Sequence, residues 1–140
     1  MAKRDGTIYE AAFRLAALER GLDVFPSEGD YSVIDLVVLN PAGKAYRVQV
    51  KGTACVGSSE GKGRPAMLNK YKIVIGRGGE KTGLSATEVD VLACYIAPRD
   101  TWFLLPMVRA MGRRSFAFFV VEGSKSQWEK YRDNWDIFLQ

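Results

Sequence analysis

The chain of 140 residues contains no histidine. This absence excludes nucleophilic catalysis by Ser/His or Cys/His pairs and histidine-ligated zinc sites. It also excludes nucleases whose general base or nucleophile is a histidine. Any chemistry must therefore depend on Asp, Glu, Lys or Tyr side chains, or on a hard metal ion.

Cysteines and long apolar runs are also scarce. Cys55 and Cys94 form no C-x-x-C motif, which favours two free thiols in a reducing compartment over a disulfide. No apolar run approaches the roughly 18 residues that a membrane-spanning helix needs. The first ten residues, MAKRDGTIYE, carry basic residues without the apolar segment of a signal peptide. We therefore expect a cytoplasmic protein.

The overall composition is that of a folded protein with a mild positive charge. Hydrophobic residues make up 47% and charged residues 26% of the chain, which at this length predicts a single domain over residues 1–140. The net charge of +4 and the pI of about 9.1 are compatible with a polyanionic partner without identifying one.

Helical periodicity is clear at the start of the chain. In residues 6–21 an apolar stripe recurs at spacings of three and four, and Gly21 is a natural stop. Glu10 lies off that stripe. The stripe consists of Ile8, Ala11, Ala12, Leu15 and Leu18.

Several strands follow this helix. A short strand and a loop are expected in residues 22–32, and two strands in residues 33–39 and 46–52 are joined by the turn signal NPAGK. Further apolar segments predict strands within residues 71–76, 89–97, 101–107 and 113–123.

The last segment, residues 124–140, predicts a helix. Ser126 and Glu129 have the spacing of a capping box, and an aromatic stripe of Trp128, Tyr131, Trp135 and Phe138 follows at helical spacing. Such a stripe is more typical of a core or a subunit interface than of a base-stacking surface. The order of helix, strands and helix predicts an α/β or α+β sandwich built on a mixed sheet.

Polar side chains interrupt the two strands that look most buried. Because side chains alternate along a strand, Gln49 and Lys51 share one face, and pairing of the valine-rich faces brings Asp35 to the same side. Burial of such groups requires partners. A divalent cation held by Asp35, the amide oxygen of Gln49 and the backbone carbonyl of Val50 is one solution, since hard oxygen ligands suit Mg²⁺. A structural ion pair between Asp35 and Lys51 explains the same residues equally well.

The order of Glu10, Asp35 and the tripeptide Gln49-Val50-Lys51 resembles the PD-(D/E)XK nuclease superfamily. That family has a glutamate on its first helix, an aspartate on a core strand and an (E/Q)-x-K tripeptide on the next strand. The G-x-x-x-E pattern of Gly6 and Glu10 resembles the branch that holds group I intron homing endonucleases and archaeal-type Holliday junction resolvases.

This resemblance implies a restriction-endonuclease-like α/β core, with a mixed central sheet flanked by helices. It implies a metal-dependent DNA endonuclease that uses Mg²⁺, with Mn²⁺ as a substitute, in a bacterial, archaeal or phage-type intracellular protein. Asp35 would be the central metal ligand and Gln49 a second one, with Val50 contributing its carbonyl. Lys51 would position or activate the water, and Glu10 would reach the metal.

The chain departs from the family pattern at Gln49, where a glutamate is the commoner residue. A glutamine removes one formal charge from the metal site, so a catalytically weak or inactive DNA-binding module on the same fold is the alternative. The resemblance leaves two kinds of substrate open, a specific duplex site or a branched junction, and implies a homodimer or homotetramer. Exposed basic residues are the candidate DNA contacts: Lys62, Arg64, Arg77, Lys81, Arg113 and Arg114.

Overall fold

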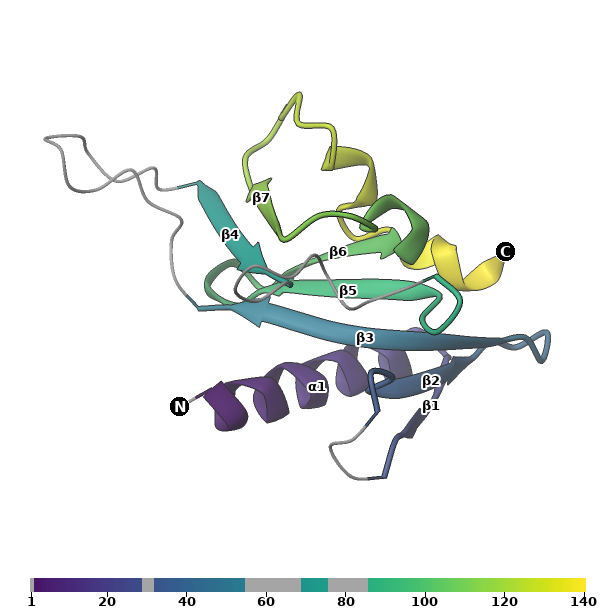
Figure 1. Cartoon of the computed structure of the whole chain (residues 1–140). Helices are drawn as coiled ribbons and strands as arrows, with labels where there is room; N and C mark the ends of the chain where they lie inside the picture. The colour runs from purple at the N-terminus through teal and green to yellow at the C-terminus, as the bar shows by residue number, and fades with distance from the viewer. Residues whose placement is uncertain (1, 29–31, 55–68, 76–85) are drawn as a thin grey trace, which may run out of the picture.

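A mixed sheet lies at the centre of the computed structural model, which describes residues 2–28, 32–54, 69–75 and 86–140 (Figure 1). Within these residues the sheet has five strands in the order β1-β2-β3-β5-β6. The β3–β5 pair is parallel and the other neighbouring pairs are antiparallel. The strands are β1 (Asp23–Pro26), β2 (Leu36–Leu39), β3 (Ala45–Thr53), β5 (Val91–Ile96) and β6 (Thr101–Pro106).

Different elements cover the two faces of this sheet. Helix α1 (Ala2–Glu19) packs on one face, below the sheet in Figure 1. The antiparallel pair of β4 (Lys70–Val74) and β7 (Ser115–Phe119) packs on the other. This arrangement confirms the α/β class and the mixed sheet that the sequence predicts. None of the described helices is long and apolar enough to span a membrane.

Alternation along β3 divides its side chains between the two layers. Val48 and Val50 belong to the apolar cluster between α1 and the sheet, so Gln49 and Lys51 point to the opposite face. On that face their parallel neighbours in β5 are Leu92 and Cys94.

The buried face of α1 differs from the apolar stripe seen in the sequence. Tyr9, Phe13 and Ala17 are buried against the sheet, whereas Ile8 and Leu15 of the predicted stripe are 53% and 61% exposed. The aromatic rings fill the space between α1 and the sheet, where the ring centres of Phe13 and Trp102 are 5.4 Å apart. The choice of face therefore follows the larger side chains rather than the more regular stripe.

The first of the two central strands is shorter than predicted. Residues 33–35 lie outside β2, although the amide of Asp35 still donates to the carbonyl of Val48 at 2.9 Å. Val33 and Ile34 pack against the cluster on the β4–β7 side. The turn is as predicted: Gly43 has φ +89°, and Oδ1 of Asn40 accepts a hydrogen bond from the amide of Lys44.

The predicted C-terminal α-helix is wrong. Short 3₁₀ helices η3 (Glu129–Tyr131) and η4 (Trp135–Leu139) occupy this segment, and Asp133 between them has a left-handed backbone with φ +49°. The amide of Asp133 donates to the carbonyl of Trp102 at 2.7 Å, so the chain follows the edge of β6 instead of coiling.

The aromatic residues of this segment are core residues, but they do not line one side. Trp128 and Tyr131 belong to the cluster on the β4–β7 face, and Trp135 and Phe138 to the cluster between α1 and the sheet. The capping box also fails, because Glu129 pairs with Arg132. The hydroxyl of Ser126 accepts a hydrogen bond from the amide of Trp128 instead.

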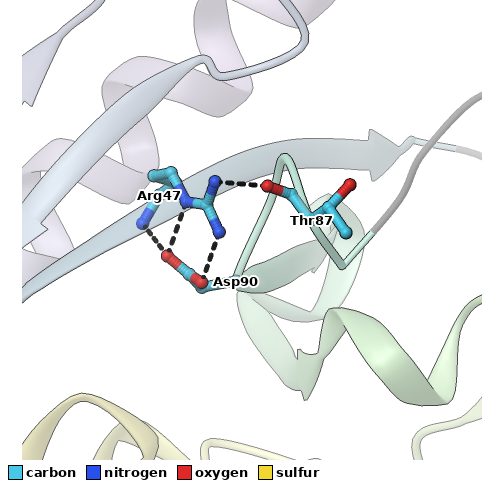
Figure 2. Close-up of polar contacts among 3 residues, drawn as sticks. All are labelled: Arg47, Thr87 and Asp90. Atoms are coloured by element: carbon cyan, nitrogen blue, oxygen red, sulfur yellow. Dashed lines mark hydrogen bonds and ion pairs between the residues drawn. The ribbon is translucent and has the colours of Figure 1, made fainter.

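Arg47 fixes the start of β5 against β3 (Figure 2). Its Nε and Nη2 donate to the two carboxylate oxygens of Asp90 at 3.0 and 2.8 Å, and its Nη1 donates to the carbonyl of Thr87 at 2.7 Å. The backbone amide of Arg47 also donates to Asp90, and the amide of Asp90 returns a bond to the carbonyl of Arg47. These contacts set the register of the parallel pair on which Gln49 and Lys51 lie.

Candidate active site

Asp35 directly precedes β2 and lies beside Val48 and Val50 of β3. Its Oδ2 accepts a hydrogen bond of 2.8 Å from the backbone amide of Val50. Its own amide donates to the carbonyl of Val48, and its carbonyl accepts from the amide of Ser27. The carboxylate is therefore held in place by backbone contacts on both sides.

The environment of this carboxylate leaves its negative charge incompletely compensated. Burial raises the pKa of Asp35 above its usual value, and the hydrogen bond from Val50 and the positive charge of Lys51 oppose that rise without cancelling it. A further cation beside Asp35 would stabilise the ionised form.

Gln49 presents an unused oxygen on the same face as Lys51. The residue is only 9% exposed, and its Oε1 is buried without a hydrogen-bond partner among the described residues. A buried amide oxygen without a partner costs free energy of roughly 1–3 kcal/mol. An oxygen of this kind is suited to bind a ligand such as a hard cation.

The backbone of Val50 lies beside Asp35 at this edge of β3. Its amide donates to Asp35, and the N–H and C=O groups of one residue in a strand point to the same side. The carbonyl of Val50 is therefore directed towards the edge at which Asp35 lies.

Glu10 comes from α1, one residue after Tyr9. The ring of Tyr9 packs directly on Gly52, where an added Cβ would lie 2.4 Å from Cδ2 of the ring. Glu10 is half-buried, unlike the fully solvated glutamate expected on an outer helix face. The packing of Tyr9 thus anchors the helix segment of Glu10 beside the C-terminal half of β3.

The structure brings Asp35, Val50 and Lys51 into direct proximity, with Gln49 on the face of Lys51. Within the described residues there is no group of three or more Asp, Glu, Cys or His side chains that could hold a metal. A cation at this site would therefore depend on the amide of Gln49 and the carbonyl of Val50 in addition to carboxylates. Cys94, which lies opposite Lys51, is fully buried, and burial raises its pKa, so it is unsuited to act as a thiolate.

The structure describes two of the six candidate DNA-contact residues. Lys62, Arg64, Arg77 and Lys81 lie outside the described residues. Arg114 is exposed. Arg113 is partly buried, and its guanidinium lies over the rings of Phe116 and Trp128 at 5.4 and 4.8 Å.

A basic cavity of about 660 Å³ surrounds Arg113. Arg109 and Lys130 line it as well, and Nε of Arg109 donates to the hydroxyl of Tyr131 at 3.1 Å. Nothing in the sequence pattern groups these three basic residues, since they come from η2 (Met107–Arg109), the following turn and η3. Only the packing of the C-terminal segment on β7 brings them together.

The family model described as PD-(D/E)XK endonuclease matches residues 1–138. Among solved structures, the bacterial homing endonuclease I-Ssp6803I is similar with a TM-score of 0.75 and 21% identity, covering 100% of this chain and 92% of that chain. The likeness confirms the restriction-endonuclease-like fold. No curated protein matches the chain.

Proposed function

Because the chain belongs to the PD-(D/E)XK endonuclease family, we propose that it is a metal-dependent DNA endonuclease over a single domain of residues 1–140. Membership in this family indicates a nuclease that hydrolyses phosphodiester bonds in DNA. The residues of the candidate active site support the further proposal that this nuclease depends on a metal ion.

The buried Oε1 of Gln49, which has no hydrogen-bond partner within the part of the chain that the structure describes, is the observation that carries this proposal. A buried side-chain amide oxygen is normally hydrogen-bonded in a native structure. Here it lies on the face of Lys51, one residue before Val50, whose amide binds Asp35, a carboxylate whose pKa is raised by burial. Both features fit a site that is completed by a divalent cation, of the kind that nucleases of this family generally use.

Four residues would hold the cation: Asp35 and Glu10 through carboxylates, Gln49 through its amide oxygen, and Val50 through its carbonyl. The neutral glutamine and the few carboxylates suit Mg²⁺, which binds through one or two carboxylates and retains several waters, with Mn²⁺ as a substitute. When bound, the ion neutralises charge on the scissile phosphate and lowers the pKa of a water molecule.

The protein's own groups then orient the reactants. The ammonium of Lys51, close to Asp35, can donate hydrogen bonds to a phosphate oxygen or to the attacking water. The hydrogen bond from Val50 keeps Asp35 on the edge of β3, so the carboxylate requires little reorganisation when DNA binds. In-line attack by water, with the 3′ oxygen as the leaving group, yields 5′-phosphate and 3′-hydroxyl ends.

The similarity to a bacterial homing endonuclease supports a site-specific duplex substrate over a branched junction. Arg113 and Arg114, together with Lys62, Arg64, Arg77 and Lys81, would supply the salt-dependent contacts to the DNA backbone. A homodimer or homotetramer would allow both strands to be cut.

The test is cleavage of labelled DNA in Mg²⁺ or Mn²⁺, with a large random-sequence duplex library and a synthetic four-way junction as substrates. Discrete fragments recovered repeatedly from the library would support site-specific cutting. Paired nicks in the junction alone would reassign the protein as a junction resolvase.

Two substitutions and matched controls identify the site. Asp35→Asn and Lys51→Met should each lower the rate at least ~100-fold, as expected when one metal ligand or positioning charge is removed from a phosphoryl-transfer site. Asp136→Asn and Lys125→Met, at exposed positions, should leave it unchanged. Binding of DNA without cleavage in either metal would instead favour the inactive DNA-binding module.

A further inference from the structure

The outer face of α1 carries an apolar row that no described element covers (Figure 1). Ile8, Leu15 and Leu18 are 53%, 61% and 55% exposed, and Ala11 lies between them on the same face. The opposite face of the helix, with Tyr9 and Phe13, is buried against the sheet. The outer apolar row is therefore separate from the face of α1 that packs in the core.

The spacing of this outer row is that of a helix–helix seam. Its members, Ile8, Ala11, Leu15 and Leu18, follow one another at intervals of three, four and three residues. This is the a/d pattern of a coiled coil, which gives a narrow stripe that fits a second helix. Arg4 occupies the next seam position towards the N-terminus, so the apolar seam spans two heptads and ends there.

We propose that this seam, Ile8, Ala11, Leu15 and Leu18, pairs α1 with α1 of a second copy of the chain, in parallel and across a twofold axis. Such an interface is isologous, because the same row meets itself. Ala11 would face Ala11 of the second copy and allow close approach of the two helices.

Charges beside the seam select the parallel orientation. Arg14 and Glu19 are exposed and flank the seam on its two sides, at g and e positions of the heptad. In a parallel pair a g residue lies beside the e residue five positions later in the other helix, so Arg14 meets Glu19 twice. In an antiparallel pair g positions meet each other, and the two Arg14 guanidinium groups would repel.

The extent of the seam predicts a weak dimer. Stable interfaces bury about 800 Å² on each partner, more than four side chains on one helix can supply. The helix is, however, already ordered by its packing on the sheet, so association does not require helix nucleation. We expect a monomer–dimer equilibrium that depends on protein concentration in the range of about 1–100 μM.

Self-association requires no cleavage, so its test is independent of the proposed nuclease activity. Sedimentation equilibrium over that concentration range should show reversible dimerisation of the full chain. Leu15→Lys should raise the dimer dissociation constant by about 100-fold, because each dimer loses two buried leucines. Leu139→Lys is the matched control, since Leu139 is also 61% exposed but lies on η4. Its dissociation constant should equal that of the original chain.

A charge exchange tests the orientation. Arg14→Glu and Glu19→Arg should each raise the dissociation constant by about tenfold, and the double variant should restore it. Absence of an effect in the single variants would overturn the parallel arrangement.

Cross-linking gives a second, direct reading. Ala11→Cys should form a disulfide-linked dimer under mild oxidation, whereas Ala42→Cys in the exposed turn between β2 and β3 should not. A chain that remains monomeric at 100 μM and gives no cross-link at residue 11 would overturn the proposal, provided that circular dichroism shows a native fold.

Discussion

The ring of Tyr9 lies on the backbone of Gly52, so close that a Cβ at residue 52 would be 2.4, 2.6 and 2.8 Å from three of its carbon atoms. Gly52 directly follows Lys51, and Tyr9 directly precedes Glu10. One contact therefore sets the position of α1 relative to the strand that carries the candidate active site. No side chain larger than hydrogen fits at residue 52 without movement of the helix or the ring.

We predict that Gly52→Ala displaces Tyr9 and with it the segment of Glu10. Overpacking of this kind costs about 1–3 kcal/mol of stability. The cleavage rate should fall more than about tenfold, because a misplacement on the order of 1 Å at a reacting centre is sufficient. Thermal unfolding and single-turnover cleavage measure the two effects.

Gly6→Ala in the same helix is the control for this prediction. A Cβ at residue 6 would meet nothing within 4 Å, so the substitution should stabilise α1 by roughly 0.5–1 kcal/mol. Unchanged stability and activity in Gly52→Ala would contradict the role assigned to the contact with Tyr9.

Gln49→Glu tests the proposed metal ligand. A carboxylate at this position adds a negative charge beside Asp35, so the dissociation constant for Mn²⁺ should fall about tenfold, measured by isothermal titration calorimetry. In the presence of a chelator the same variant should unfold at a lower temperature, because two neighbouring carboxylates are then buried without a cation.

The matched control is Gln127→Glu, at an exposed glutamine. It should change neither metal affinity nor the difference in unfolding temperature between chelator and metal. If Gln49→Glu binds Mn²⁺ with unchanged affinity, Oε1 of Gln49 is not a ligand.

Much of the sheet could be predicted from the sequence because strand periodicity is simple. The period of two placed Gln49 and Lys51 on one face, away from Val48, and the structure agrees. The prediction that Asp35 lies near Gln49 and Lys51 followed from the hairpin turn that pairs the two strands. Gly43 and Asn40 fix this turn locally. Local geometry of this kind is encoded within a few residues.

The orientation of α1 could not be predicted in this way. The helix has two apolar rows, and the outer row of Ile8, Leu15 and Leu18 is the more regular one. Only the aromatic neighbours of Phe13 on distant parts of the chain, such as Trp102 and Trp135, show which row is buried. The packing of Tyr9 on Gly52 depends on the same long-range arrangement.

The prediction of a C-terminal α-helix failed for a related reason. Its aromatic spacing is helical, but Trp128 and Trp135 are buried in clusters on opposite faces of the sheet. A continuous helix cannot supply both. Burial of these rings in two clusters, together with the hydrogen bond from the amide of Asp133 to the carbonyl of Trp102, outweighs the local helical preference.

Asp90→Asn should lower stability at neutral pH and lose that effect in acid. Hydrogen bonds from the Arg47 side chain are the main reason that the pKa of Asp90 is lowered in the fold. A lowered pKa means that the stabilisation is present above the unfolded pKa of about 3.9 and is lost as pH falls through the lower folded value. The difference in unfolding temperature between Asp90→Asn and the original chain should therefore be largest near pH 7 and shrink below about pH 4.

Arg47→Met provides the control for this pH dependence. With the guanidinium removed, the additional change Asp90→Asn should have a smaller effect on stability that varies little with pH. The raised pKa of Asp35 acts in the opposite direction but is common to all four proteins, so it cancels in the differences. A pH-independent difference for Asp90→Asn alone would contradict the assignment.

Arg113 and Arg114 should respond differently to loss of charge. Arg114 is exposed, so Arg114→Met should weaken DNA binding on all sequences and reduce the slope of log affinity against log salt by about one. Arg113→Met should in addition lower stability, because the guanidinium stacks on Phe116 and Trp128, each contact being worth roughly 0.5–2 kcal/mol. Lys44→Met, in the turn between β2 and β3, controls for the change in net charge.

Fluorescence anisotropy with a non-cleaved duplex in Ca²⁺ at several salt concentrations measures the slope. An unchanged slope in Arg114→Met would remove Arg114 from the DNA interface and leave the basic cavity around Arg113 as the stronger candidate on this side of the sheet.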